Sequence, residues 1–249
     1  MYFGIVTFVF SFILFANVLF AQMHTHALIS EDFSSELGGW QPDIEFDNFS
    51  NAPWERSTTD GYSEDNSYMR MRMEGSNSDN SRFLAFNTGS DWTGDFIAKG
   101  VTAIALKLAN FSATDTVYLR IAISNSNNPL QPGGTGTWWM SDDFIQYDPE
   151  SGWSDASFKI TESSMHRVTS LYDGIGTDSF EDTLSDIKEI RILSSQFSDS
   201  IPIGDHFAGI VGIDDIQLIE IPEPNMIPLI LLTSIAAFYF KPKNLNNNN

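Results

Sequence analysis

The stretch Tyr68-Met69-Arg70-Met71-Arg72-Met73 alternates strictly between methionine and a polar or amphipathic side chain. Successive side chains of a β-strand point to opposite faces of the sheet, so this period of two predicts a half-buried strand. Similar short alternations, separated by turns rich in Gly, Asn, Asp and Ser, predict further strands at residues 82–86, 102–108, 116–123, 156–160, 187–193 and 210–221. The one predicted helix is short, at residues 180–185. The pattern indicates an all-β antiparallel β-sandwich.

The last predicted strand, Ile210–Ile221 (IVGIDDIQLIEI), does not alternate cleanly. Apolar and acidic side chains fall on both of its faces, because Ile213 shares a face with Asp215 and Ile216 shares a face with Asp214. We therefore expect a bend or a bulge near the two aspartates.

The chain is strongly acidic, with 13 Lys and Arg against 33 Asp and Glu among 249 residues. Residues 1–21 carry no charged side chain, and the tail from Pro222 holds two lysines and one glutamate. The middle therefore has 11 basic and 32 acidic residues, a net charge of −21. Such a region repels phosphate backbones, which argues against nucleic acid as a partner. We expect one domain with a full core over residues 28–221.

Residues suited to catalysis are absent or wrongly spaced. The chain has no cysteine, which removes disulfides, thiolate metal sites and a cysteine nucleophile. The four histidines form no H-x-x-x-H pair, and there is no Gly-x-Ser-x-Gly motif. Asp43, Glu45 and Asp47 would share one strand face, which resembles laminarinase-like glycosidases, but the order of acids differs from the E-x-D-x-x-E of those enzymes. We predict a non-catalytic protein, with a glycosidase as the remote alternative.

The first segment, residues 1–21 (MYFGIVTFVFSFILFANVLFA), is continuously apolar and ends in a small residue. It resembles a secretory signal peptide, with cleavage expected after Ala21 or, as a second choice, after Ala27. No Lys or Arg precedes the apolar core, and the segment is long enough to span a bilayer, so a retained anchor is the alternative.

The end of the chain, residues 222–249, begins with Pro222-Glu223-Pro224, continues with an apolar segment over 226–240, and has a basic end at Lys241 and Lys243. The two prolines cannot continue a sheet and predict an extended linker. As a helix, the apolar segment would rise about 22 Å, less than the roughly 30 Å of a hydrocarbon core. The lysines favour a cytoplasmic C-terminus.

This order of motif, apolar segment and basic end resembles the PEP-CTERM sorting signal of Gram-negative bacteria. The resemblance implies export across the inner membrane and processing near Pro222-Glu223-Pro224 by an exosortase, which is a membrane enzyme. It also implies a cell-surface or extracellular protein, held in the membrane by its C-terminal segment until processing, in a cell that makes exopolysaccharide or biofilm matrix. A generic C-terminal anchor is the alternative.

Both ends of the middle region resemble the first and last strands of jelly-roll carbohydrate-binding modules, through Asp32-Phe33 with Gly38-Gly39-Trp40 and through Gly212-Ile213-Asp214-Asp215-Ile216. The region also resembles uncharacterised exported domains that carry the same tail. The first resemblance implies that these two strands pair and hold a structural Ca²⁺, an ion that takes six to eight oxygen ligands. The candidate ligands are Glu31, Asp32, Asp214 and Asp215. The alternative is that the two late aspartates only protect a sheet edge or cap a turn.

Four aromatic residues near Gly-rich loops are candidates for stacking on a carbohydrate: Trp138, Trp139, Tyr147 and Trp153. Neighbouring strand residues point to opposite faces, so at most one of Trp138 and Trp139 belongs to the core and the other is expected to face outward. The alternative is that these rings serve packing and edge covering.

Together these patterns predict an exported, non-catalytic cell-surface or matrix protein with a jelly-roll β-sandwich and polysaccharide as a candidate partner. The alternative function is that of a calcium-stabilised, lectin-like carbohydrate-binding module.

Overall fold

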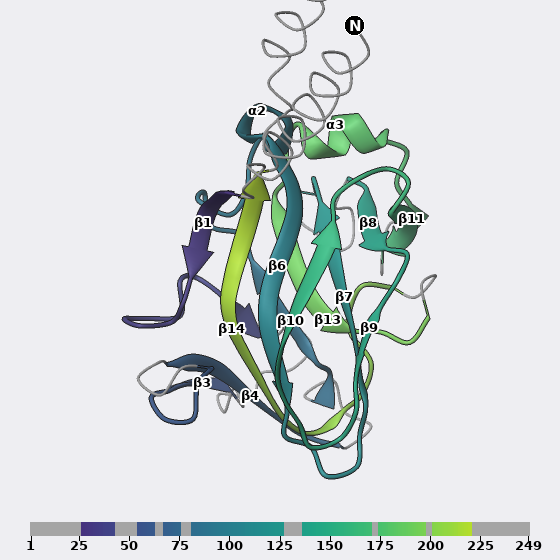
Figure 1. Ribbon diagram of the computed structural model, residues 1–249. Coiled ribbons are helices and arrows are strands. Elements are labelled where there is room, and N and C mark those ends of the chain that lie inside the picture. Colours follow the sequence, from purple (N-terminus) through teal and green to yellow (C-terminus); the bar gives the residue numbers. More distant parts are fainter. Residues whose placement is uncertain are drawn as a thin grey trace, which may run out of the picture. The chain divides into compact units, whose positions relative to one another are not determined.

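Two antiparallel sheets make up the computed structural model, which describes residues 26–42, 54–62, 67–75, 81–126, 136–170, 174–197 and 201–220 (Figure 1). Within these residues sheet I has six strands: β1 (His26–Glu31), β3 (Trp54–Ser57), β4 (Tyr68–Glu74), β6 (Val101–Asn110), β10 (Ser151–Lys159) and β14 (Ala208–Glu220). Sheet II, counted over the same residues, has eight: β2 (Gln41–Pro42), β5 (Leu84–Asn87), β7 (Val117–Ser124), β8 (Trp138–Ser141), β9 (Ile145–Tyr147), β11 (Met165–Ser170), β12 (Gly174–Ile175) and β13 (Glu189–Ser194). The predicted antiparallel sandwich is confirmed.

Sheet I is organised around β14. One edge of β14 pairs with β6, and the other pairs first with β4, over Ala208–Ile213, and then with β1, over Ile216–Glu220. The domain's first and last strands therefore pair, as expected. The register against β6 shifts between Asp214 and Gln217, and Asp215 has a φ of 48°. This bulge confirms the expected irregularity, and it lies where the edge partner changes from β4 to β1.

The main core lies between the two sheets. Its members include, from sheet I, Met69, Met71, Leu106 and Ile213 and, from sheet II, Leu119, Ile121 and Ile192. The methionines of β4 thus point inward, while Arg70 points to the outer face and its guanidinium lies 2.5 Å from Glu55 of β3. The alternation that predicted β4 is therefore confirmed in its register as well as its position.

Two short helices occur among the described residues, α2 (Phe96–Lys99) and α3 (Phe180–Leu184), and they contact each other at one end of the sandwich (Figure 1). The second confirms the helix expected over 180–185. The first was not expected, because four residues are too few to show a helical period. Caps define it instead, since the Asp95 carboxylate accepts a hydrogen bond from the Ala98 N–H at 2.8 Å and Gly100 ends the helix with a φ of 72°.

No helix within the described residues is long and apolar enough to cross a membrane. The expected signal peptide, the Pro222-Glu223-Pro224 motif, the apolar segment 226–240 and the acidic residues 43–47 all lie outside the described residues. The statements made about them from the sequence stay predictions.

Candidate functional site

Aromatic side chains gather on the outer face of sheet I, and we call Tyr62, Tyr68, Phe111 and Trp153 the aromatic patch. The indole of Trp153 meets two rings edge-on, with centroid distances of 5.2 Å to Tyr68 and 6.0 Å to Phe111. Tyr68 is buried, whereas Phe111 is 40% exposed and Tyr62 is 50% exposed. The patch therefore presents aromatic surface to solvent above a buried ring.

Trp153 can lie across sheet I because the strands beneath it carry small residues. Gly212 of β14 is the register partner of Ala109 of β6, and a Cβ atom at Gly212 would lie 2.7 Å from the Cη2 atom of Trp153. The indole Nε1 donates a hydrogen bond of 3.0 Å to the carbonyl oxygen of Asp60. This bond joins β10 to the segment that carries Tyr62. The indole is therefore held at its Nε1 atom by Asp60, while its Cη2 atom lies over Gly212.

Replacing Gly212 by alanine should displace the Trp153 ring and lower the free energy of unfolding by about 1–3 kcal/mol, the usual range for overpacking. Gly152→Ala is the matched control, because a Cβ atom there meets nothing within 4 Å. Both substitutions restrict the unfolded chain alike, so the difference between them reports the clash. Urea unfolding measures it, and equal stabilities of the two variants would contradict the packing described here.

Lys107 of β6 borders the aromatic patch and links it to two carboxylates. Its Nζ atom lies 2.6 Å from Oδ1 of Asp155, 3.9 Å from Oδ2 of Asp215 and 3.9 Å from the centre of the Tyr62 ring. Burial lowers the pKa of Lys107, but the hydrogen bond and charge of Asp155 outweigh it, and the net effect is a raised pKa. Lys107 therefore stays charged and holds the Tyr62 ring and the Asp155 carboxylate in place.

Asp214 lies buried below the segment that carries Tyr62. Its carboxylate accepts hydrogen bonds from the backbone N–H of Asp215 at 2.7 Å and from that of Tyr62 at 3.4 Å. Burial raises the pKa of Asp214 to about 6, and the negative charges of Asp215 and Asp32 add to the rise. The residue is 0% exposed, and its hydrogen bond to the Tyr62 N–H positions the segment that carries this ring.

Asp214 should make the fold more stable as the pH falls from 7 to 5. Its pKa is higher in the folded protein than in the unfolded chain, so the folded state binds the proton more tightly; the gain is complete below the unfolded pKa and is lost as the pH rises through about 6. We expect the wild type to gain about 1 kcal/mol over Asp214→Asn between these two pH values. Urea unfolding at both pH values measures this, and a constant difference would contradict it.

The structure brings the four predicted calcium ligands near one another without forming a ligand set. β1 pairs with β14 so that Glu31 lies opposite Ile216, next to the bulge at Asp214 and Asp215. Glu31 and Asp32 each accept a hydrogen bond from the backbone N–H two residues further on; burial raises the pKa of Glu31, and this hydrogen bond lowers that of Asp32. Among the described residues, no three His, Cys, Asp or Glu side chains form a group that could hold a metal ion. The calcium site stays a prediction.

The two neighbouring tryptophans point to opposite faces of β8, as expected, but both are buried. Trp139 packs in the main core, and its Nε1 donates a hydrogen bond to the Thr183 hydroxyl at 3.1 Å. Trp138 is 1% exposed and packs in a second apolar cluster on the outer face of sheet II, with Met140 among its neighbours and the Arg191 guanidinium 4.2 Å from its ring centre. The expectation that one of these rings faces solvent is therefore wrong, because side chains also cover this outer face.

The remaining two predicted aromatics lie in different surroundings. Tyr147 is 3% exposed in the main core, whereas Trp153 belongs to the aromatic patch. Tyr62, Phe111 and Lys107 were not predicted. Lys107 and Phe111 come from β6 and the residue that follows it, and Tyr62 comes from a distant segment that reaches them through its contacts with Lys107 and Asp214. The sequence offers one signal for an exposed ring, which is an aromatic residue directly before a turn, as Phe111 stands before Ser112.

No protein-family model matches the sequence, and no curated protein matches it. Among solved structures, the chain is similar to the family 11 carbohydrate-binding module from Clostridium thermocellum in complex with a β-1,3-1,4-mixed-linked tetrasaccharide, at 17% identity over 79% of this chain and 95% of that chain, with a TM-score of 0.47. The CBM22-1 xylan-binding domain of Paenibacillus barcinonensis Xyn10C is 10% identical over 78% of this chain and 94% of that chain, with a TM-score of 0.45. An exo-β-agarase is 12% identical over 81% of this chain and 26% of its own, with a TM-score of 0.43. All three TM-scores are below 0.5, so the fold assignment rests on the two sheets themselves.

Proposed function

We propose that this protein is a non-catalytic carbohydrate-binding protein that holds a polysaccharide on its aromatic patch. The observation that carries the proposal is the exposure of Tyr62 and Phe111 on the outer face of sheet I together with Trp153, whose ring is fixed there. The C–H faces of sugar rings pack against aromatic rings by apolar contact. Rings that are already held in place lose little conformational entropy on binding, which favours affinity.

Polar groups next to the rings supply partners for sugar hydroxyls. The Asp155 side chain is 82% exposed and is oriented by Lys107. The Asp215 side chain is 33% exposed, and its Oδ1 accepts a hydrogen bond of 2.7 Å from Nε2 of Gln217. A few oriented polar groups beside apolar surface are typical of ligand sites, where they fix the orientation of the bound molecule.

The charge of the domain favours a neutral polysaccharide. Acidic residues outnumber basic ones by 33 to 13 over the whole chain. Polymers rich in uronate or sulfate would be repelled by this field, whereas uncharged chains would not. We therefore place the ligand among neutral polysaccharides.

The acids near the aromatic patch support binding over hydrolysis. A glycosidase needs a carboxylic acid of raised pKa at the glycosidic bond, with a second carboxylate about 5–9.5 Å away. Two carboxyl groups near the bulge have a raised pKa: Asp214, which is 0% exposed, and Glu31, whose carboxylate accepts a hydrogen bond from the Phe33 N–H. Asp214, with no exposed surface, cannot donate a proton to a bound sugar, and Glu31 is already engaged by the backbone.

A glycan array tests the proposal. The wild type should bind neutral glycans. In a Phe144→Ala background, which removes a separate exposed ring, Tyr62→Ala and Phe111→Ala should each weaken binding at least about tenfold. Ile97→Ala is the matched control, because Ile97 is 49% exposed on α2 and lies outside the aromatic patch. Absence of neutral-glycan binding by the wild type would refute the proposal, and so would patch variants that bind as well as the control.

We also propose that Pro222-Glu223-Pro224 directs sorting to the cell surface, supported by the order of motif, apolar segment 226–240 and basic end. Replacing the three motif residues by alanine should leave the C-terminal segment attached, because the processing enzyme would no longer recognise its site. Mass spectrometry of the C-terminus, in cells that produce an exosortase, makes the comparison. The same mature C-terminus in wild type and variant would contradict this role.

A further inference from the structure

A second aromatic site lies on the outer face of sheet II, and we call Tyr118, Arg120, Asp142, Phe144 and His166 the Phe144 site. The Phe144 ring is 39% exposed and meets Tyr118 edge-on, with a centroid distance of 5.1 Å. The guanidinium carbon of Arg120 lies 5.3 Å from the centre of the Phe144 ring. The site thus combines an exposed ring, a second ring that supports it and a cation beside it.

Arg120 supports the Phe144 ring from below. It is 2% exposed and donates hydrogen bonds to the carbonyl oxygens of Ser195 at 2.8 Å, Ser141 at 2.5 Å and Asp142 at 2.8 Å. Ser141 ends β8, and Asp142 begins the connection from β8 to β9, on which Phe144 lies. A buried, multiply bonded guanidinium therefore fixes the position of this connection and its exposed ring.

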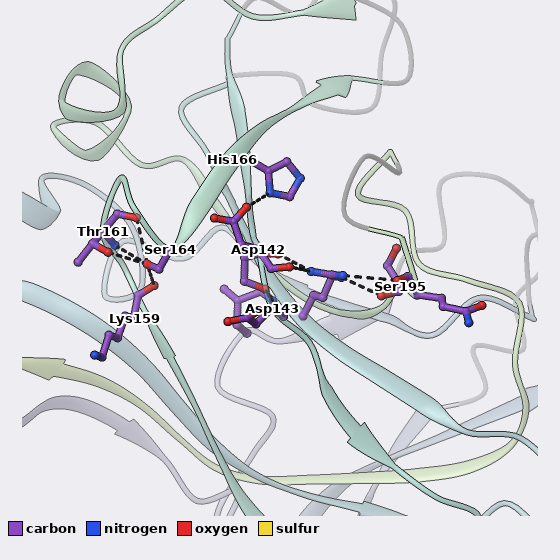
Figure 2. Close-up of polar contacts among 11 residues, drawn as sticks. Asp142, Asp143, Lys159, Thr161, Ser164, His166 and Ser195 are labelled. Atoms are coloured by element: carbon purple, nitrogen blue, oxygen red, sulfur yellow. Dashed lines mark hydrogen bonds and ion pairs between the residues drawn. The ribbon is translucent and has the colours of Figure 1, made fainter.

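Asp142, two residues before Phe144 on the same connection, is paired with His166 of β11. Nδ1 of His166 lies 2.7 Å from Oδ1 of Asp142, and the two side chains are 26% and 46% exposed. Figure 2 shows these two side chains pointing toward one another. A carboxylate held by a neighbouring base presents its second oxygen in a defined direction, as sugar hydroxyls require.

The Phe144 site repeats the chemistry of the aromatic patch on the opposite side of the sandwich. Each has an exposed ring beside a cation, and each has an exposed carboxylate paired with a basic group. Arg120 alternates along β7 with core residues such as Leu119, and Lys107 alternates along β6 with core residues such as Leu106. Leu106 and Leu119 belong to the same core between the two sheets, so Lys107 and Arg120 point away from it on opposite sides of the sandwich.

We infer that the Phe144 site binds a second chain of the same class of neutral polysaccharide, so that one protein molecule cross-links two chains. The inference rests on the proposed function of the aromatic patch. Sites on opposite faces of a sandwich, whose sheets pack about 10 Å apart, are not in line for one short oligosaccharide. Two chains held by one rigid domain form a junction in a polymer network.

Calorimetric titration of the whole protein counts the sites. The probes are short oligosaccharides cut from mixed-linkage β-glucan and from galactomannan, which are both neutral. The wild type and Ile97→Ala should bind about two oligosaccharides per chain, and Phe144→Ala and Trp153→Ala about one each. In Phe144→Ala the remaining site should keep its affinity to within about twofold, since the sites share no residue. The intact polysaccharides should become more viscous with the wild type and not with either single variant.

The outcomes separate this inference from the proposed function. One bound oligosaccharide in the wild type, lost in Trp153→Ala and kept in Phe144→Ala, would overturn the second site and leave the proposed function standing. One bound oligosaccharide lost in Phe144→Ala and kept in Trp153→Ala would overturn both the cross-linking and the proposed role of the aromatic patch. No binding of either probe would overturn the neutral-polysaccharide assignment for both sites.

Discussion

Replacing Glu189 by alanine is expected to lower the free energy of unfolding by about 3–5 kcal/mol, a large part of the stability of an ordinary domain. Glu189 and Arg191 are 2% and 1% exposed, and their side chains meet at 2.5 Å from Nε to Oε1. Arg191 also donates a hydrogen bond of 2.6 Å to the carbonyl oxygen of Pro202 and lies over the Trp138 ring. Removing the carboxylate leaves a buried guanidinium without its counter-charge, which is why the effect is large.

Two further variants show whether burial causes this effect. Asp186→Ala breaks an exposed ion pair, in which the Asp186 side chain is 58% exposed and the Lys188 side chain 38% exposed. This variant should change the free energy of unfolding by less than about 1 kcal/mol. The double variant Glu189→Ala with Arg191→Met removes both buried charges and should recover most of the loss. Urea unfolding compares the three. Equal losses in Glu189→Ala and Asp186→Ala would contradict a buried pair.

Replacing Trp153 by alanine should weaken neutral-polysaccharide binding at the aromatic patch about 30-fold, equivalent to about 2 kcal/mol. The indole provides the largest ring of the patch and connects Tyr68 with Phe111. Its removal takes away stacking surface and also the hydrogen bond to Asp60 that fixes the neighbouring segment. Trp153→Phe keeps a ring at the position and should lose much less.

The affinity of each Trp153 variant is measured by titration with the polysaccharide found on the array, in the Phe144→Ala background so that one site is observed. Ile97→Ala controls for loss of an exposed apolar side chain elsewhere. The melting temperature shows whether the variant remains folded. A folded Trp153→Ala protein with unchanged affinity would remove Trp153 from the site.

The fold was predictable wherever the sequence pattern of a strand shows which of its two faces lies against the core. The alternation of Tyr68 to Met73 predicted β4, because its methionines fill the space between the sheets. The mixed faces around Asp214 and Asp215 predicted a bulge, because a regular strand would have turned apolar residues outward there. Both patterns can be read within one strand, because each is set by which side of that strand faces the core.

The outer faces of the sheets were not predictable from such patterns. Trp138 points away from the main core, as its alternation with Trp139 requires, yet a second apolar cluster and Arg191 cover it. Whether an outward side chain meets solvent or another segment depends on loops far away in the sequence. The two-residue strands β2 and β12 exist only through their partners and carry no pattern of their own.

The candidate site was predictable only in part for the same reason. The sequence points to Trp153 as part of an aromatic platform and to Asp214 and Asp215 as part of a separate calcium site. The strand register places Lys107 opposite Asp155 of β10 and opposite Asp214 of β14. Lys107 therefore connects the strand that carries Trp153 with the strand that carries the two aspartates. Tyr62 joins them across the fold through its N–H bond to Asp214.

The central claim is that sugar rings stack on the aromatic patch, and saturation-transfer NMR tests it most directly. Aromatic protons of the Phe144→Ala protein are irradiated in the presence of a bound neutral oligosaccharide, and the saturation that reaches each sugar proton is recorded. We expect strong transfer to the C–H protons of one sugar face, and its loss when Trp153→Ala is added. Equal transfer with and without Trp153 would contradict the claim.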